Sequence, residues 1–434
     1  MSNFFKFVLI TIFLLSCSLD SKSGFWSKPQ KIKKENEIVI KKLFEEDKSL
    51  DNEFNKNVKI KLNSQTSVNN LKKNLSNNSG IINYDGELKS ISRYKFSKID
   101  NFKSTDPDII FDKKNIIFFD NKGSILKFDQ SSKLLWKTNY YNKSEKKLKP
   151  LLNMAIHKNY LIVTDNLSKY YAVDVNSGKL IWMKKNIAPF NSQVKIYNNQ
   201  FFATDFKNTL RCFSLKDGNE IWNVKTDTSF VKSQKKLSLV LSNKTVYFNN
   251  SIGDIGAVDI KSGKLIWQTP TQDSSIYESS FLLKTSDLVL VENLLLFSNN
   301  KNEFYSLDIK TGTLIWEQKI NSITRPSISD NLVFTVTNEG FLVIIESKSG
   351  NIIRITNIFD KIKEKKRPDI KPVGFIIGKN KIYLTTSNGR LIVINTATGR
   401  SELILKIDNE MISRPFILDK NLFIIKNNAI IKLD

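Results

Sequence analysis

Four stretches of the chain read VNSGKLIW (residues 175–182), LKDGNEIW (215–222), IKSGKLIW (260–267) and IKTGTLIW (309–316). An earlier copy, QSSKLLW (130–136), has Ser132 in place of the glycine, and two later copies have Arg354 and Leu403 in place of the tryptophan. The copies recur about every 38 to 49 residues, which is the length of a four-stranded propeller blade. Five of the six tryptophans occupy this one position, and we expect them to be structural: Trp136, Trp182, Trp222, Trp267 and Trp316.

Each copy follows two short apolar runs joined by a polar turn, as in NYLIVTDNLSKYYAVDV. Runs of four to six residues rich in Val, Ile, Phe and Tyr, bounded by Asn, Asp and Gly, predict a β-hairpin. The glycine then supplies a turn with positive φ, and the tryptophan begins the outermost strand, where it can pack on the neighbouring blade. An aspartate recurs before the turn, at Asp129, Asp174, Asp259 and Asp308, and we expect it to accept bonds from turn amides.

The hairpin recurs eight times, with starts near Asn115, Asn159, Gln200, Lys244, Asn293, Asn331, Lys381 and Asn421, whereas the outer-strand marker recurs seven times after Lys133. The last hairpin therefore lacks an outer strand. Tyr94, in ELKSISRYKF, lies one repeat period before Trp136. We predict an all-β fold: an eight-bladed propeller of four-stranded blades, closed by an N-terminal strand that completes the last blade.

The first residues, SNFFKFVLITIFLLSC, resemble a secretory signal whose end, Leu14 to Cys17, is similar to a bacterial lipobox. We expect a lipoprotein signal peptide at 1–16 and acylation of Cys17; Ser18 after it favours the outer membrane. Residues 17–83, rich in Lys, Asn and Ser, are predicted to be a lipid-anchored flexible tether, and residues 84–434 the propeller. The apolar run at 37–44 is a candidate for docking on the ring.

The formal net charge of +24 raises the question of nucleic-acid binding. The lysines are scattered through every blade rather than gathered with aromatics on one face, and an exported protein meets no genome. We therefore expect no nucleic-acid partner; attraction to anionic lipid headgroups is the milder alternative. The second cysteine, Cys212, lies in an apolar strand and is expected to be a small core residue.

No constellation of catalytic residues stands out. His157 is the only histidine, so the multi-histidine sites of catalytic zinc cannot form, and it is expected at the surface. No phosphate-binding glycine motif occurs. We predict no catalytic residue, no metal site and no cofactor.

The repeated phrase resembles the PQQ-like repeat of quinoprotein dehydrogenases. Those enzymes typically carry adjacent cysteines, acidic and Asn ligands for calcium and an Asp base, and this chain has no paired cysteines. The chain resembles the BamB family of the outer-membrane β-barrel assembly (BAM) machinery. The resemblance consists of the lipobox, the basic tether, the eight blades and the loss of the tryptophan from the later repeats. That resemblance implies a non-catalytic scaffold lipoprotein on the periplasmic face of the outer membrane. Its implied partners are a BamA-like barrel protein with periplasmic domains, other BAM subunits and unfolded outer-membrane proteins.

The resemblance also implies contact with the BamA-like partner through two neighbouring loops. The first corresponds to residues 226–236, where Phe230, Val231, Lys232 and Lys235 would supply apolar and cationic contacts. The second corresponds to residues 271–286, where Lys284 stands in place of an expected acid. Phe230 and Val231 could equally be core residues at a strand edge. Two other functions stay open: a quinone-dependent dehydrogenase, and a generic periplasmic propeller that binds a ligand at the ring's centre.

Overall fold

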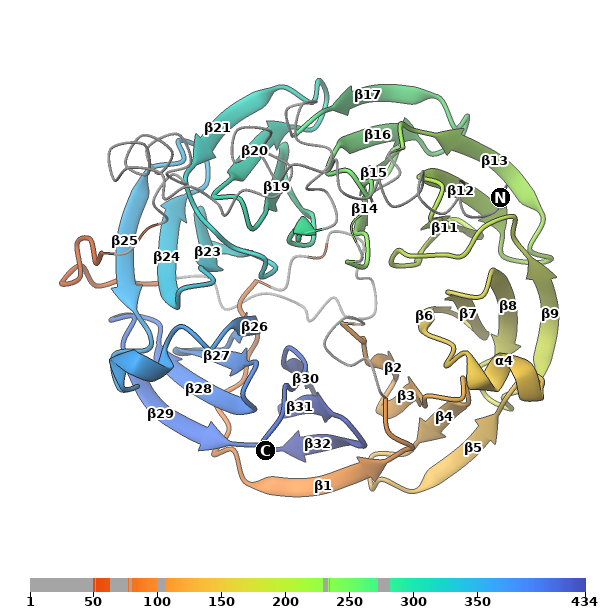
Figure 1. Cartoon of the computed structure of the whole chain (residues 1–434), viewed down its shortest axis with the longest axis horizontal. Coiled ribbons are helices and arrows are strands. Elements are labelled where there is room, and N and C mark those ends of the chain that lie inside the picture. Colours follow the sequence, from red (N-terminus) through yellow and green to blue (C-terminus); the bar gives the residue numbers. More distant parts are fainter. Residues whose placement is uncertain are drawn as a thin grey trace, which may run out of the picture. The chain divides into compact units, whose positions relative to one another are not determined.

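A computed structural model of the chain describes residues 50, 52–62, 77, 80–99, 106–228, 233, 235–271 and 282–434. These residues form eight four-stranded antiparallel sheets arranged as blades around a ring (Figure 1). The predicted signal peptide, Cys17 and the apolar run at 37–44 lie outside the described residues. The described part of the chain holds no helix of the length and apolarity that a membrane crossing requires.

The blades follow one another along the chain, and we number them in that order. Blade 1 consists of β2 (Ile110–Asp112), β3 (Asn115–Phe119), β4 (Ile125–Phe128) and β5 (Leu134–Thr138), and blade 2 of β6 (Leu152–His157), β7 (Tyr160–Asp165), β8 (Lys169–Asp174) and β9 (Leu180–Lys185). Blade 3 consists of β10 (Lys195–Tyr197), β11 (Gln200–Thr204), β12 (Thr209–Ser214) and β13 (Glu220–Lys225), and blade 4 of β14 (Leu239–Leu241), β15 (Thr245–Asn249), β16 (Ile255–Asp259) and β17 (Leu265–Thr269). Blade 5 consists of β18 (Val289–Val291), β19 (Leu294–Ser298), β20 (Phe304–Asp308) and β21 (Leu314–Gln318), and blade 6 of β22 (Ser327–Ser329), β23 (Leu332–Val336), β24 (Phe341–Glu346) and β25 (Ile352–Asn357). Blade 7 consists of β26 (Pro372–Ile377), β27 (Lys381–Thr386), β28 (Arg390–Asn395) and β29 (Ser401–Lys406). Blade 8 is β30 (Phe416–Leu418), β31 (Asn421–Lys426), β32 (Ala429–Leu433) and β1 (Ser90–Lys95), and two short helices, α4 (Lys143–Lys147) and η3 (Glu364–Lys366), lie in loops.

The closure of the ring is confirmed. Strand β1 pairs antiparallel with β32 and completes the sheet that β30 begins, so the two ends of the propeller domain share blade 8. The Tyr94 hydroxyl donates to the backbone carbonyl of Gln130 in blade 1, 3.1 Å away. The predicted hairpin starts agree to within one residue with the first residues of the second strands of the blades. Each of these strands begins where a polar turn gives way to a run of β-branched and aromatic residues.

The marker tryptophan of blades 1 to 5 contacts the glycine turn of the next blade. Trp182 Nε1 donates to Leu215 O of the next blade at 3.1 Å, and Trp316 Nε1 donates to Ser347 O at 2.8 Å. The indole lies over the glycine of the same neighbouring turn, where a side chain would collide with it: a Cβ added at Gly350 would lie 2.6 Å from Trp316 Cγ. The remaining indoles make the same bond, from Trp136 to Val175 O, Trp222 to Ile260 O and Trp267 to Ile309 O.

The recurrent aspartates cap their turns as expected. Asp174 Oδ1 accepts from the amides of Asn176 and Ser177, and Asp308 Oδ1 accepts from those of Lys310 and Thr311. The Ser177 hydroxyl, which also donates to Asp174, and then these amide bonds favour the ionised carboxylates and hold the pKa of both groups below its ordinary value.

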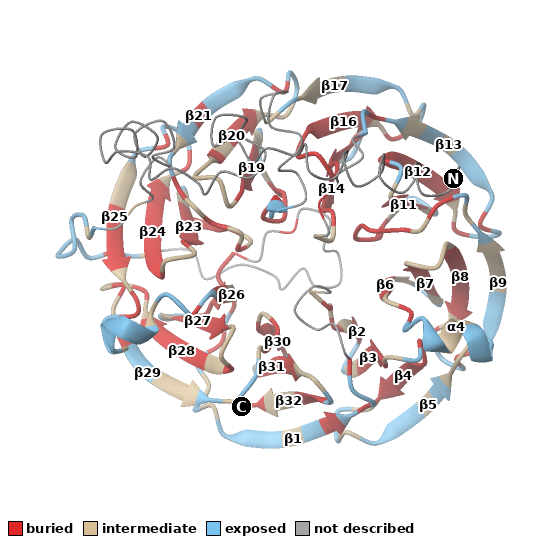
Figure 2. Cartoon of the chain, in the orientation of Figure 1, coloured by how far each residue is buried: buried red, intermediate tan, exposed pale blue. Residues whose placement is uncertain are grey.

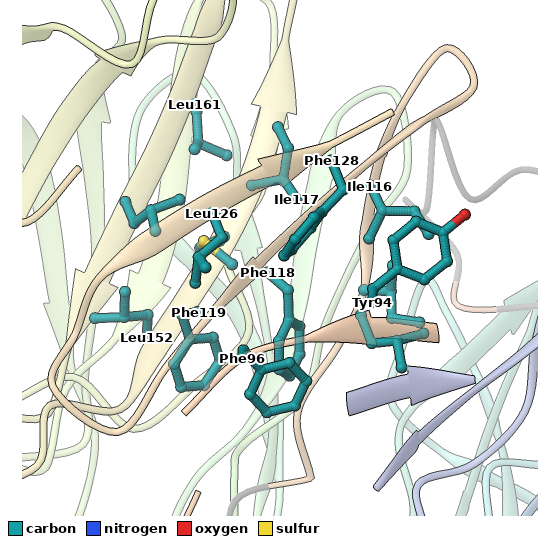
Figure 3. Close-up of a cluster of buried hydrophobic side chains, with 14 of the residues drawn as sticks. Tyr94, Phe96, Ile116, Ile117, Phe118, Phe119, Leu126, Phe128, Leu152 and Leu161 are labelled. Carbon is teal, nitrogen blue, oxygen red and sulfur yellow. The ribbon is translucent and has the colours of Figure 1, made fainter. Parts of the chain in front are cut away.

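The core lies between adjacent blades, because the two middle strands of each blade are covered on both faces (Figure 2). Figure 3 shows one such cluster, in which Tyr94 and Phe96 from the closing strand pack on Phe118 and Phe128 of blade 1. The closing strand is therefore part of the core and not merely an edge partner.

Some residues of the predicted tether pack on the ring. Phe54 forms an antiparallel bridge with Ile355 on the outer strand β25, and Ile60 is buried in the core between blades 6 and 7. Ile81 pairs with Ile377 at the end of β26, and Ile82 is buried between blades 7 and 8. These described residues of the segment therefore contact the ring, and the side chains of Ile60, Ile81 and Ile82 are buried there.

Candidate functional site

All connections between blades lie on one side of the ring, since each inner strand begins on the side where the preceding outer strand ends. We call this side the entry face. It carries both loops that were predicted to contact a partner, residues 226–236 before β14 and 271–286 before β18. Phe230, Val231 and Lys232 lie outside the described residues.

The described parts of these two loops are joined to each other. Ser233 Oγ donates to Leu283 O at 2.7 Å. Lys235 Nζ donates to the backbone carbonyls of Thr285 and of Ile323, the latter at 3.2 Å. Lys284 is exposed on the second loop, whereas Lys235 points into the ring and is not presented on its rim. The two loops thus form one surface, with Lys284 on its outside.

Charged side chains gather at the mouth of the central channel on the entry face, at or just before the inner strands. Asp108 Oδ2 accepts from Lys236 Nζ at 2.9 Å and Asp108 Oδ1 from Arg414 at 2.5 Å. Arg325 pairs with Asp287 through its Nε at 2.8 Å. Although burial opposes their ionisation, these cations hold the pKa of both carboxyls well below its ordinary value. No sequence motif marks this cluster, because its members come from loops that are distant along the chain.

Asn77 lies buried inside the channel and connects three blades. Its side-chain amide donates to Gln193 Oε1 at 3.1 Å, Ser238 Oγ at 3.0 Å and Leu288 O at 3.1 Å, and its carbonyl accepts from Lys195 Nζ at 2.6 Å. A residue of the predicted tether therefore joins the starts of the inner strands of blades 3, 4 and 5.

The outer rim carries a belt of exposed aliphatic side chains. In most blades the two residues before the marker position are about 40 to 50% exposed, beside an outer strand with an open edge. The members of this belt are Leu134, Leu135, Leu180, Ile181, Ile221, Leu265, Ile266, Leu314 and Ile315.

Blade 6 differs, because the described residues 52–62 cover its edge. The equivalent Ile352 and Ile353 are only partly exposed, and Phe54 and Ile355 exchange backbone hydrogen bonds at 3.1 and 2.9 Å. Arg354, at the marker position, donates to Val58 O at 2.9 Å and to Thr396 O at 3.1 Å. The bond to Thr396 O is equivalent to the bond that each marker tryptophan makes to the next blade, and the bond to Val58 O holds residues 52–62 on blade 6.

The described residues offer little for catalysis. No group of three or more His, Cys, Asp or Glu within them could hold a metal ion. Cys212 is fully buried, and burial raises the pKa of its thiol to about 12, so it does not supply a thiolate. His157 ends β6 and is partly exposed, with its pKa lowered by burial and by Lys158.

Eight four-stranded blades, five of them joined to the next blade by a marker tryptophan, define a β-propeller of PQQ-like repeats. A family model described as the outer membrane protein assembly factor BamB matches residues 121–356, more than half of the chain. The chain belongs to this BamB family.

Solved structures agree on the fold. BamB from Moraxella catarrhalis superposes with a TM-score of 0.64 at 13% identity, covering 80% of this chain and all of that one. The quinohemoprotein alcohol dehydrogenase from Comamonas testosteroni gives 0.63 at 10% identity, covering 82% of this chain and 78% of that one. The computationally designed protein Ika8 gives 0.61 at 12% identity, covering 80% and 99%. At such identities the likeness concerns the fold alone. No curated protein sequence matches the chain significantly.

Proposed function

We propose that this protein is a non-catalytic scaffold lipoprotein of outer-membrane protein assembly, held to the periplasmic face of the outer membrane through Cys17. The observation that carries the proposal is the match of residues 121–356 to the BamB family.

The entry face is the proposed docking surface for a barrel protein with periplasmic domains. The two joined loops would present Phe230, Val231, Lys232 and Lys284 there. Lys235 takes a different part, since its ammonium stabilises the contact between the loops. Its replacement would act on the shape of the surface rather than on a direct contact.

The outer rim is the proposed contact for unfolded outer-membrane proteins. The docking of residues 52–62 on blade 6 supports this, because a segment of this chain covers there the aliphatic pair that other blades expose. An incoming strand would add to an open edge through backbone bonds and cover the aliphatic pair with its own apolar side chains.

The test of the docking surface is affinity capture of the tagged, detergent-solubilised protein from its native membranes, with mass spectrometry of the captured proteins. We expect a large barrel protein with periplasmic domains, lost when Lys232→Glu and Lys284→Glu are combined. Lys348→Glu, an exposed lysine on the opposite face, is the matched control. Equal recovery by both variants would contradict the docking surface, and absence of any barrel protein would contradict the scaffold.

The test of the rim is cross-linking to an unfolded barrel protein. Leu265→Asp with Ile266→Asp should reduce the cross-linked product, whereas Ile187→Asp, at an aliphatic residue off the outer strands and 77% exposed, should not. The quinone-dependent alternative is tested by adding pyrroloquinoline quinone and calcium to the pure protein, where a bound chromophore would support it.

A further inference from the structure

A small cavity opens at the channel mouth, beside the inner strands of blades 8, 1, 2 and 3. Its volume is about 50 Å³, large enough for a few waters or one small ion. Apolar residues such as Met154 and Phe416 line part of it. The polar lining residues are Asp108, Asn153, Gln193, Lys195, Lys236 and Arg414.

Among the described residues, positive charge exceeds negative charge around this cavity. Three cations, Lys195, Lys236 and Arg414, line it with one carboxylate, that of Asp108. The next described charged residues along the mouth leave the excess unchanged, because Lys235 and Arg325 are balanced by Asp106 and Asp287. Buried charge without compensation is costly, and a bound counter-ion removes that cost.

The donors are held in place from several directions. The Arg414 guanidinium carbon lies 4.2 Å from the centre of the Phe416 ring, and one of its terminal nitrogens is bound to Asp108. Its Nε is buried and has no hydrogen-bond partner among the described residues. Lys195 comes from β10 and Lys236 from the loop before β14, so donors approach the cavity from three blades.

We propose that this cavity binds a phosphate-type oxyanion, either free phosphate or the phosphate group of a larger molecule. A phosphate monoester carries a charge of about −1.5 to −2 at neutral pH, which matches the excess of cations over carboxylates around the cavity. Several donors on different sides suit a tetrahedral anion better than a planar carboxylate, and arginine and lysine are common phosphate ligands.

The pKa of Lys195 gives the proposed site a pH dependence. Burial, and then the positive charge of Arg325, lower the pKa of Lys195 to about 7, although Asp287 and Asp108 oppose the shift. An anion next to the ammonium would favour its protonated form. The contribution of Lys195 should therefore make phosphate binding stronger at pH 6.5 than at pH 8.5.

The test is thermal unfolding of the purified full chain at constant ionic strength while inorganic phosphate replaces chloride. A ligand of the folded state raises the melting temperature progressively as phosphate rises from about 0.1 to about 10 mM. We expect this rise in the wild type and in Lys371→Gln, which changes an exposed lysine before β26. We expect at least tenfold weaker binding in Arg414→Gln and in Lys195→Met.

Two further measurements keep the test decisive. Line broadening of the ³¹P signal of inorganic phosphate reports binding without unfolding, and circular dichroism checks that each variant is folded. Micelles containing phosphatidic acid, compared with phosphatidylcholine, distinguish a lipid phosphate from the free ion; a response to either phosphate supports the site. A phosphate response no larger than that to acetate, or an undiminished response in both folded variants, would overturn the proposal.

Discussion

The contact between a marker tryptophan and the glycine of the next blade predicts a specific energetic coupling. Gly350 has φ of +76°, and a Cβ added there would lie 2.6 Å from Trp316 Cγ. Gly350→Ala should therefore cost about 1–2 kcal/mol for the left-handed backbone and about 1–3 kcal/mol for the overlap with the indole. Trp316→Ala should cost about 3–5 kcal/mol, because Trp316 is 7% exposed and its Nε1 satisfies Ser347 O.

The double variant separates these contributions. Once the indole is gone, Gly350→Ala should retain only the backbone cost, so the two changes together should be less destabilising than their sum by about 1–3 kcal/mol. Urea unfolding followed by circular dichroism gives the four free energies, with fluorescence of the remaining tryptophans as a check that the transitions coincide.

A matched pair provides the control. Gly178→Ala has the same backbone strain, with φ of +71°, but its Cβ would meet Trp136 and not Trp316. Combined with Trp316→Ala it should be additive to within about 0.5 kcal/mol. Additivity of the Gly350→Ala and Trp316→Ala pair would refute the reasoning that the glycine is there to admit the indole.

Three other changes test separate parts of the fold. Arg354→Trp restores the marker residue but removes the donor to Val58 O, so amide hydrogen exchange at residues 54–60 should accelerate at least tenfold while blade 7 is unaffected; unchanged exchange would contradict the clamp. Tyr94→Phe should destabilise the ring by about 1 kcal/mol in urea, since it leaves Gln130 O without its donor, whereas a neutral effect would speak against this bond in ring closure. Lys195→Met should be stabilising near pH 8 in phosphate-free buffer, and the difference from wild type should shrink by about 1.4 kcal/mol per pH unit towards pH 10. The sign follows because the pKa of Lys195 is lowered to about 7 in the folded chain, whereas its ordinary value is near 10.5. Between these two values only the unfolded chain holds the proton, so the stability of the wild type rises with pH. A difference between variant and wild type that stays constant with pH would disprove the lowered pKa.

The ring could be predicted from sequence because each blade is local. A repeat supplies its own hairpin, turn and marker residue, and the same period recurs along the chain, so the blade count and the closing strand around Tyr94 followed from spacing alone. The contact of Tyr94 with Gln130 O is the same bond that the tryptophans make, which is why one aromatic could be aligned with another across the repeat.

The channel mouth could not be predicted in the same way. Asp108, Asp287, Arg325 and Arg414 each lie two residues before an inner strand, yet their pairing depends on which blades face each other across the ring. That information is absent from any one repeat. The position of Lys235 shows the same limit, because a lysine in a polar loop reads as a surface residue until the neighbouring loop supplies carbonyls for its ammonium.

The two repeats that lost their tryptophan lie where the N-terminal residues pack. At blade 6, Arg354 keeps the bond to the next blade, and its buried guanidinium also binds Val58 O, a contact that an indole with its single donor could not add. Burial, followed by the charge of Arg400, lowers the pKa of Arg354 to about 10, so the group still carries its charge at neutral pH. At blade 7, Ile81 and Tyr84 bond to the end of β26 and the turn that follows it. The loss of the marker tryptophan thus coincides with the part of the ring that described N-terminal residues contact, while blades 1 to 5 keep the marker and have no partner on their outer edges among the described residues.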